Sequence, residues 1–125
     1  MGCNIHGYVE VNRNGRRWEP WLIEPYLDRD YRVFAKLANV RNYGEIEPIA
    51  EPRGFPENIS NEMQELYESL EGDAHSMSWV TAQELLFGLA TIEMEIEWHV
   101  FVDLVKVLIR FFRIENVRFV FFFDD

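Results

Sequence analysis

The segment Val117–Phe123, VRFVFFF, decides the fold. Its residues are aromatic or β-branched on both faces of an extended chain, which is typical of a central strand covered on both sides. Residues 4–11, NIHGYVEV, instead alternate between a polar and an apolar face, as a half-buried strand does. We expect these strands to be antiparallel neighbours, an arrangement that would bring Cys3 and His6 close to Phe121–Asp124.

A hairpin and four helices are expected around this pair. Asn14-Gly15 tolerates the positive φ angles of a tight turn, so residues 16–23 are predicted to be the return strand, with Pro20 at an edge or a bulge. Apolar spacing predicts helices over about 31–40, 61–70, 82–90 and 92–113. Gly and Pro mark residues 39–59 as a long loop, and residues 73–80 are interpreted as a linker.

These elements predict a single α+β domain over residues 1–125, in which a small antiparallel sheet carries helices packed on one face. The chain has 125 residues, 48% of them hydrophobic, so it is long enough for one core. It has one cysteine, which excludes an internal disulfide. Neither a signal peptide nor an apolar stretch of about 18 residues is visible, so we expect a cytoplasmic location.

The charge pattern is the strongest indication of function. Twenty-two acidic residues against 12 basic ones give a net charge of −10, which argues against direct nucleic-acid binding and against docking on anionic lipid. No Lys or Arg occurs from Gly54 to Val105. An acidic surface for a basic partner protein is therefore predicted, with a merely solvated face as the alternative. Its candidate residues are Glu62, Glu65, Glu68, Glu71, Glu93 and Glu97.

A second set of residues, Cys3, His6, His75 and Asp124, could bind a divalent metal. Zinc takes four such ligands, or three and a water. Cys3-x-x-His6 has a workable spacing, although a regular strand would place these two side chains on opposite faces. The alternative is a buried cysteine with two hydrogen-bonded histidines.

A third set consists of Arg32, Arg41 and Arg53, whose guanidinium groups could bind phosphate or carboxylate in a bidentate manner. Arg53 lies in a Pro- and Gly-rich segment that could line a pocket for an anion or a nucleotide. The chain has no GxxxxGK[ST] phosphate loop. Arg32 and Arg53 could equally neutralise the surplus carboxylates.

Several segments together resemble a widespread family of small phage and prophage proteins. They are the opening MGCNIH, residues 31–41, PIAEPRGFP at 48–56, HSMSW at 75–79 and VFFFD at 120–124. The family has no agreed activity, so the resemblance implies a phage origin and little chemistry. It also adds His75, Ser78 and Trp79 to the candidate ligand-binding residues. Asn4 and Met77 stand where the family usually has Asp and His, and both changes remove a potential metal ligand.

Two functions remain open from the sequence. The first is a phage accessory protein in the cytoplasm of the infected or lysogenic host, which inhibits or modulates a host defence or nucleic-acid-processing protein through its acidic surface. The second is a pocket of Cys3, His6, Arg53, His75 and Asp124 that binds or hydrolyses a nucleotide-like anion, with or without a metal. Either could be a monomer or a homodimer, because an exposed edge strand can pair two chains.

Overall fold

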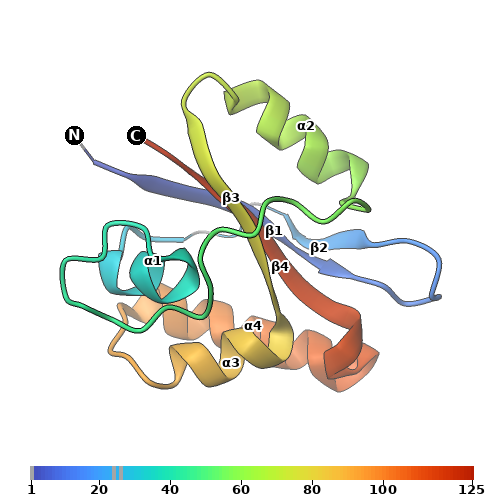
Figure 1. Cartoon of the computed structure of the whole chain (residues 1–125). Helices are drawn as coiled ribbons and strands as arrows, with labels where there is room; N and C mark the ends of the chain where they lie inside the picture. Colours follow the sequence, from blue (N-terminus) through green and yellow to red (C-terminus); the bar gives the residue numbers. More distant parts are fainter. Residues whose placement is uncertain (1, 24, 26) are drawn as a thin grey trace.

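The computed structural model describes residues 2–23, 25 and 27–125, and in this part of the chain it confirms the predicted α+β class (Figure 1). A four-stranded antiparallel sheet has the order β2-β1-β4-β3. Its strands are β1 (Asn4–Val11), β2 (Glu19–Ile23), β3 (Ala74–Thr81) and β4 (Val117–Asp124). The helices are α1 (Tyr31–Ala38), α2 (Asn61–Leu70), α3 (Ala82–Leu89) and α4 (Ile96–Phe112), with a single 3-10 turn, η1 (Ile114–Asn116).

The C-terminal strand is central, as predicted, and residues 117–123 are all buried. It pairs with β1 in an unbroken register from Asn4 opposite Asp124 to Val11 opposite Val117. Gly7 permits this close approach. A Cβ atom at Gly7 would lie 2.9 Å from Phe121 Cβ and would press against the Val120 carbonyl oxygen.

The interpretation of residues 73–80 as a linker is wrong, because this segment forms the edge strand β3 beside β4. The pairing register shifts between His75 and Ser78, and Ser76 within the shift has a φ of 55°. Such a bulge inserts residues that have no partner, so the polar–apolar alternation by which a strand is recognised is lost. The strand places His75 opposite Phe123, near the end of the central strand.

Helices lie on both faces of the sheet, so the prediction that they pack on one face is wrong (Figure 1). Apolar residues of α1, α3 and α4 form the main core with Phe119, Phe121 and Phe123. Helix α2 packs through Met63 on the opposite face, against Tyr8, Val120 and Phe122, and forms a smaller core there. Among the described residues, no helix has the length and apolarity that crossing a membrane would require.

The helix ends differ little from prediction, apart from the start of α4. We expected this helix from residue 92, but it begins at Ile96. The backbone N–H of Glu95 donates to the Asp30 carboxylate over 3.0 Å, and Asp30 also caps α1 through the N–H of Arg32. One buried carboxylate therefore determines the start of two helices.

The long loop predicted over residues 39–59 is present, and backbone hydrogen bonds attach it to α1 and β3. The Ile49 N–H donates to the Lys36 carbonyl over 2.7 Å, and the Gly54 N–H donates to the Met77 carbonyl over 2.8 Å. Ile49 also explains Gly88, which weakens α3 by about 1 kcal/mol relative to Ala. A Cβ atom at Gly88 would lie only 2.6 Å from Ile49 Cδ1.

A buried ion pair joins β1 to β4. Glu10 is fully buried and Arg118 is 5% exposed. The Arg118 guanidinium donates to Glu10 Oε1, with Nη2 at 2.7 Å and Nε at 2.8 Å. It also donates to the side chain and the carbonyl of Asn58 and lies 3.9 Å from the Trp18 ring centroid. The other Glu10 oxygen accepts the Ser60 N–H over 2.8 Å, so the pair also holds the start of α2.

Replacing only one residue of this pair is expected to destabilise the fold strongly, because the other residue is left buried and charged. In Arg118→Met, Glu10 remains buried without a counter-charge, so the free energy of unfolding should fall by about 3–5 kcal/mol. Replacing both Glu10 and Arg118 by Met should cost less than the sum of the two single changes, by about 2 kcal/mol or more. Urea denaturation of the four proteins measures both quantities, and strictly additive losses would contradict the coupling.

Candidate metal centre

Three side chains with metal-binding atoms meet at one end of the sheet, where the two ends of the chain lie close together (Figure 1). Cys3 precedes β1, His75 lies at the start of β3 and Asp125 follows β4. The strand registers bring them together, since Asn4 and Ala74 both lie opposite Asp124. Segments that are far apart in the sequence thus supply a sulfur, an imidazole nitrogen and a carboxylate oxygen to one place.

The donor atoms of Cys3, His75 and Asp125 all lie within 4.8 Å of one another. His75 Nε2 is 3.2 Å from Asp125 Oδ1. This nitrogen is shielded from solvent and, within the described part of the chain, makes no hydrogen bond of good geometry. The other ring nitrogen, Nδ1, lies 3.0 Å from Ser76 Oγ, so that Nε2 is the ring atom available to a ligand.

Tyr31, at the start of α1, and Arg41, three residues beyond the end of this helix, support the cluster. The Cys3 backbone N–H donates to the Tyr31 hydroxyl over 3.0 Å, which fixes the chain just before β1. The Arg41 guanidinium lies 5.4 Å from the Tyr31 ring centroid, and its Nη2 is 3.4 Å from Asp125 Oδ1. A positive charge therefore stands directly beside the donor atoms.

The cluster combines groups of different charge. Burial, and then the Asp125 carboxylate beside it, raise the pKa of the Cys3 thiol to about 12. The pKa of Asp125 is lowered, chiefly by the neighbouring His75 ring and then by Cys3. In the metal-free protein a protonated thiol therefore faces a carboxylate. A divalent cation binds thiolate and carboxylate together, so this donor set suits one.

A second histidine–aspartate pair lies on the opposite face of the sheet. His6 Nε2 is 3.2 Å from Asp124 Oδ1, and the His6 ring stacks on Phe122 with centroids 5.3 Å apart. His75 stacks on Phe123 instead. Successive side chains of a strand point to opposite faces, so Phe122 and Phe123 separate the two pairs.

The structure therefore corrects the predicted metal set of Cys3, His6, His75 and Asp124. It brings Cys3 and His75 together but leaves His6 and Asp124 on the other face, with Asp125 in the third position. The alternation that separates Cys3 from His6 also applies to the last strand. If Asn4 pairs with Asp124, the residue on the Cys3 face is Asp125, and this step could have been taken from the sequence once the register was assumed.

The three candidate arginines lie at three different places. Arg32 is 3.3 Å from the Asp30 carboxylate and also reaches Glu93 and Glu95, which lie just before α4. Arg41 lies at the donor cluster. Arg53 forms a bidentate pair with Glu84, with distances of 2.8 and 2.6 Å. The pairing of Arg32 and Arg53 agrees with their alternative role, which is to neutralise carboxylates.

Arg53, Ser78 and Trp79 do come together, and they attach the long loop to β3. The Arg53 backbone N–H donates to the Ser78 hydroxyl over 3.0 Å. Its guanidinium donates to the Trp79 carbonyl and lies 5.2 Å from the Trp79 ring centroid. Together with the Glu84 pair, these contacts tie the long loop to β3 and to the start of α3, so we call this cluster a clamp.

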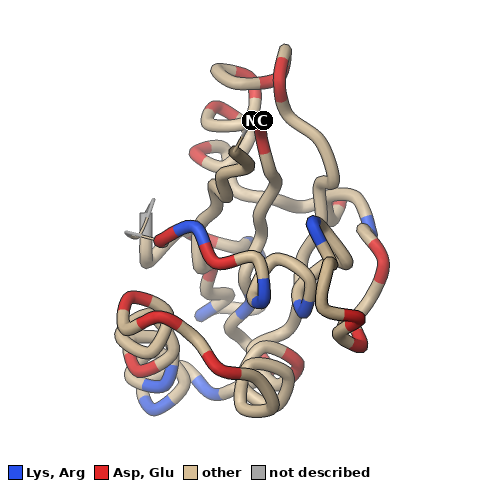
Figure 2. Tube along the Cα trace, turned by 90° about the vertical axis from the view of Figure 1, so that its left-hand side faces the viewer, with Lys and Arg blue, Asp and Glu red and all other residues tan. Residues whose placement is uncertain are grey.

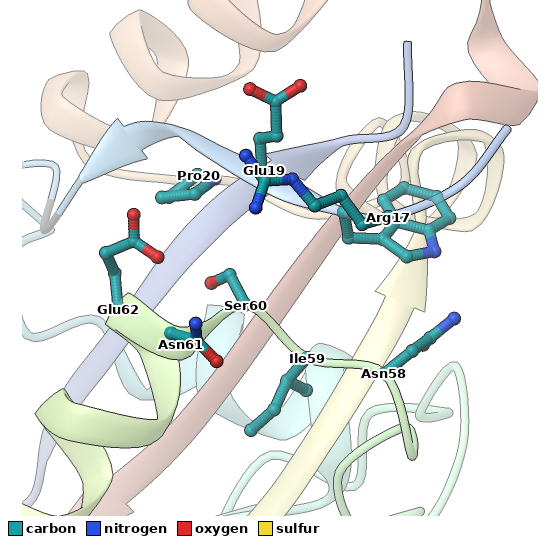
Figure 3. A pocket seen from close by; sticks show the side chains of 9 residues that line it. Arg17, Glu19, Pro20, Asn58, Ile59, Ser60, Asn61 and Glu62 are labelled. Carbon is teal, nitrogen blue, oxygen red and sulfur yellow. The ribbon is translucent and has the colours of Figure 1, made fainter. Parts of the chain in front are cut away.

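A pocket of about 260 Å³ lies away from all these residues (Figure 3). Residues 17–20 form one wall and residues 58–62 the other. Two of its polar residues, Asn58 and Ser60, already bind Arg118 and Glu10. The lining combines Arg17 with Glu19 and Glu62, so it favours neither an anion nor a cation.

The Arg53–Glu84 clamp has a defined pH dependence. Arg53, helped by the Thr81 N–H, lowers the pKa of Glu84 from 4.5 to about 2. A lowered folded-state pKa contributes stability above the unfolded value, and this stability is lost as the pH falls through the folded value. The stability difference between the wild type and Glu84→Gln should therefore be constant above about pH 5 and shrink between pH 4.5 and pH 2. Urea denaturation across this range tests it, and a difference that does not change with pH would contradict the clamp.

The residues at the end of the sheet thus form two arrangements, of which the Cys3–His75–Asp125 cluster with Arg41 is the one with three converging donor atoms. Comparison of this chain with protein-family models, with curated proteins and with solved structures finds no match.

Proposed function

We propose that this protein binds a divalent transition-metal ion of the zinc type through Cys3, His75 and Asp125. The observation that carries the proposal is the convergence of the three donor atoms within 4.8 Å. Sulfur, imidazole nitrogen and carboxylate oxygen are the three ligand types found in zinc sites. Three protein ligands leave a fourth position open, which is the arrangement of sites that bind a further ligand.

The three donor groups already contact one another in the folded chain through Asp125. His75 Nε2 is paired with Asp125 Oδ1 at 3.2 Å but makes no hydrogen bond of good geometry among the described residues, and His6 Nε2 beside Asp124 on the opposite face has the same status. The protonated Cys3 thiol is hydrogen-bonded to the Asp125 carboxylate and, after the His75 ring, contributes to the lowered pKa of Asp125. A cation bound to all three groups would satisfy each of them.

Arg41 suggests what occupies the open position. Its guanidinium stands beside Asp125, and guanidinium groups bind phosphate and carboxylate strongly. The proposed further ligand is thus a small anion of the nucleotide type, held by Arg41, which stands beside the donor atoms, whereas Arg53 contacts Ser78, Trp79 and Glu84. A bound metal would offer such an anion, or a water, its fourth coordination position.

Asn4 and Met77, where the chain departs from the family it resembles, do not weaken this proposal. Asn4 shares the strand face of His6 and Tyr8, and Met77 packs against the cluster beneath α2. Both positions thus belong to the face of the His6–Asp124 pair. The proposed donors lie on the other face.

Metal titration of the purified chain tests the proposal. One Co²⁺ per chain should bind and produce a thiolate-to-cobalt charge-transfer band, which Zn²⁺ then removes by displacement. Cys3→Ser should abolish the band. His75→Ala and His75→Gln should weaken binding at least a hundredfold, since even outer-shell partners of a metal ligand contribute about 10–100-fold.

The chain supplies matched controls for this experiment. His6→Ala removes the histidine of the opposite face, and His99→Ala removes an exposed histidine of α4. Both should bind Co²⁺ as the wild type does, with far-UV circular dichroism confirming the fold of every variant. Absence of the charge-transfer band in the wild type, or an equal loss in His6→Ala, would refute the site.

The acidic surface supports a second candidate function, the binding of a basic partner protein. Glu62, Glu65, Glu68 and Glu71 are all exposed, and within the described part of the chain none of them forms an ion pair. The upper part of Figure 2, where α2 lies, shows acidic positions and no basic one. The last turn of α2 has no basic residue, so Glu68 and Glu71 oppose the helix dipole. The row is therefore kept at some cost in stability.

In this second proposal the protein is a phage accessory factor in the bacterial cytoplasm that occupies the basic surface of a host defence or nucleic-acid-processing protein. Complementary charge would speed the encounter and make it sensitive to salt. The metal site and the acidic surface lie in different places, so one protein could use both.

Charge reversal on α2 tests the second candidate. Glu65→Lys with Glu68→Lys should abolish salt-sensitive capture of a basic host protein, while Glu45→Lys with Glu47→Lys, an equal change of charge on the exposed loop, should leave it intact. Glu65→Gln with Glu68→Gln should also raise the free energy of unfolding by a few tenths of a kcal/mol per residue, because repulsion is relieved. Capture that is unaffected by salt and by both reversals would exclude the acidic surface.

A further inference from the structure

Helix α4 has two apolar faces, and the sheet covers only one of them. Its inner face buries Trp98, Phe101, Val105 and Leu108 in the main core. A second apolar row runs along its exposed side at spacings of four, four, three and four residues. This α4 outer face consists of Ile96, Val100, Leu104, Val107 and Phe111, which are 68%, 52%, 42%, 49% and 69% exposed.

The apolar surface continues from the helix onto the edge of the sheet. Trp21 of β2 is 41% exposed and packs on Phe112, with ring centroids 4.7 Å apart. Trp21, Val100 and Leu104 line a groove of about 280 Å³. Isolated exposed apolar residues are ordinary, but a continuous patch of this kind marks an interaction surface.

The charges along α4 indicate which kind of helix could pack on this outer face. Glu97 and Asp103 lie in the N-terminal half of the helix, and Lys106 and Arg110 lie in the C-terminal half. Two such helices side by side in the same direction would bring like charges together. In opposite directions they would bring the acidic half of each helix against the basic half of the other.

We propose that the α4 outer face binds the α4 outer face of a second copy of this chain, antiparallel and about a twofold axis. The spacing of the apolar row agrees with this pairing. With the axis beside Asp103 and Leu104, Ile96 lies level with Phe111 of the partner copy and Val100 lies level with Val107. The spacing of the apolar row therefore sets the register, and the charges of the two halves of the helix set only the direction. Each surface is self-complementary, as a twofold interface requires.

The size of the surface sets the expected strength. A helix of 17 residues is about 25 Å long and 10–12 Å wide, so each copy contributes roughly 300 Å² in projection, besides the Trp21 groove. This is less than the roughly 800 Å² per partner of a standard stable interface. The dimer should therefore be in reversible equilibrium with the monomer, with a dissociation constant in the micromolar range.

Sedimentation equilibrium of the full chain, over loading concentrations from about one to several hundred micromolar, tests this pairing. A monomer–dimer equilibrium is expected. Leu104→Lys should raise the dissociation constant at least about tenfold, as the loss of a central apolar contact does. Phe87→Lys is the matched control, because Phe87 is an exposed aromatic residue on α3, outside the row, and this variant should dimerise as the wild type does. A chain that stays monomeric at every concentration would overturn the proposal.

Exchanging the charges of α4 tests its direction. Glu97→Lys with Asp103→Lys makes both halves of the helix basic, so an antiparallel dimer should weaken at least about tenfold at low salt. Adding Lys106→Glu and Arg110→Glu restores opposite halves with the polarity reversed, and dimerisation should return. An equally strong dimer in the two-residue variant would contradict antiparallel pairing.

Discussion

The buried pair between Glu10 and Arg118 is the constraint on which the rest of the fold depends. The two residues are cross-strand partners in the β1–β4 register, and both lie on the face that α2 covers. A shift of one residue would turn either side chain to the other face and separate the charges. Because Ser60 and Asn58 complete the hydrogen bonds of the pair, the same interaction also anchors the end of the long loop and the start of α2. Such a pair contributes more to specifying one register than to net stability.

The register determines the chemistry at the far end of the sheet. With Glu10 opposite Arg118, Asn4 must lie opposite Asp124, and Asp125 comes to the face of Cys3. The bulge in β3 then brings His75 to this face, while Ser78 remains free to bind the backbone of Arg53. The cluster of Cys3, His75 and Asp125 thus depends on three strands meeting in one register. A change at Arg118, distant from Cys3 in the fold, would for this reason disturb the donor atoms as well as the core.

Much of the fold follows from local rules in the sequence. The central position of 117–123, the first strand and the four helices are all set by short-range pattern. What escaped prediction depends on contacts between distant residues. The bulge hides β3, the Asp30 carboxylate moves the start of α4, and Glu10 finds its partner 108 positions later. A single Arg inside an otherwise apolar strand was a visible signal, since a buried charge needs a partner. The choice of Asp125 over Asp124 required the register itself.

The two faces of α4 show a second limit on what can be predicted from the sequence of one chain. Apolar residues at three- and four-residue spacing correctly predict a helix with a buried stripe, and Trp98, Phe101, Val105 and Leu108 occupy it. A helix that is apolar on more than one side needs more than one cover, and one sheet supplies only one. The remaining row, from Ile96 to Phe111, has the spacing of a helix–helix contact and stands between charges of opposite sign at its two ends. Within the described residues no other helix covers this side, whereas in the proposed dimer a second copy supplies one.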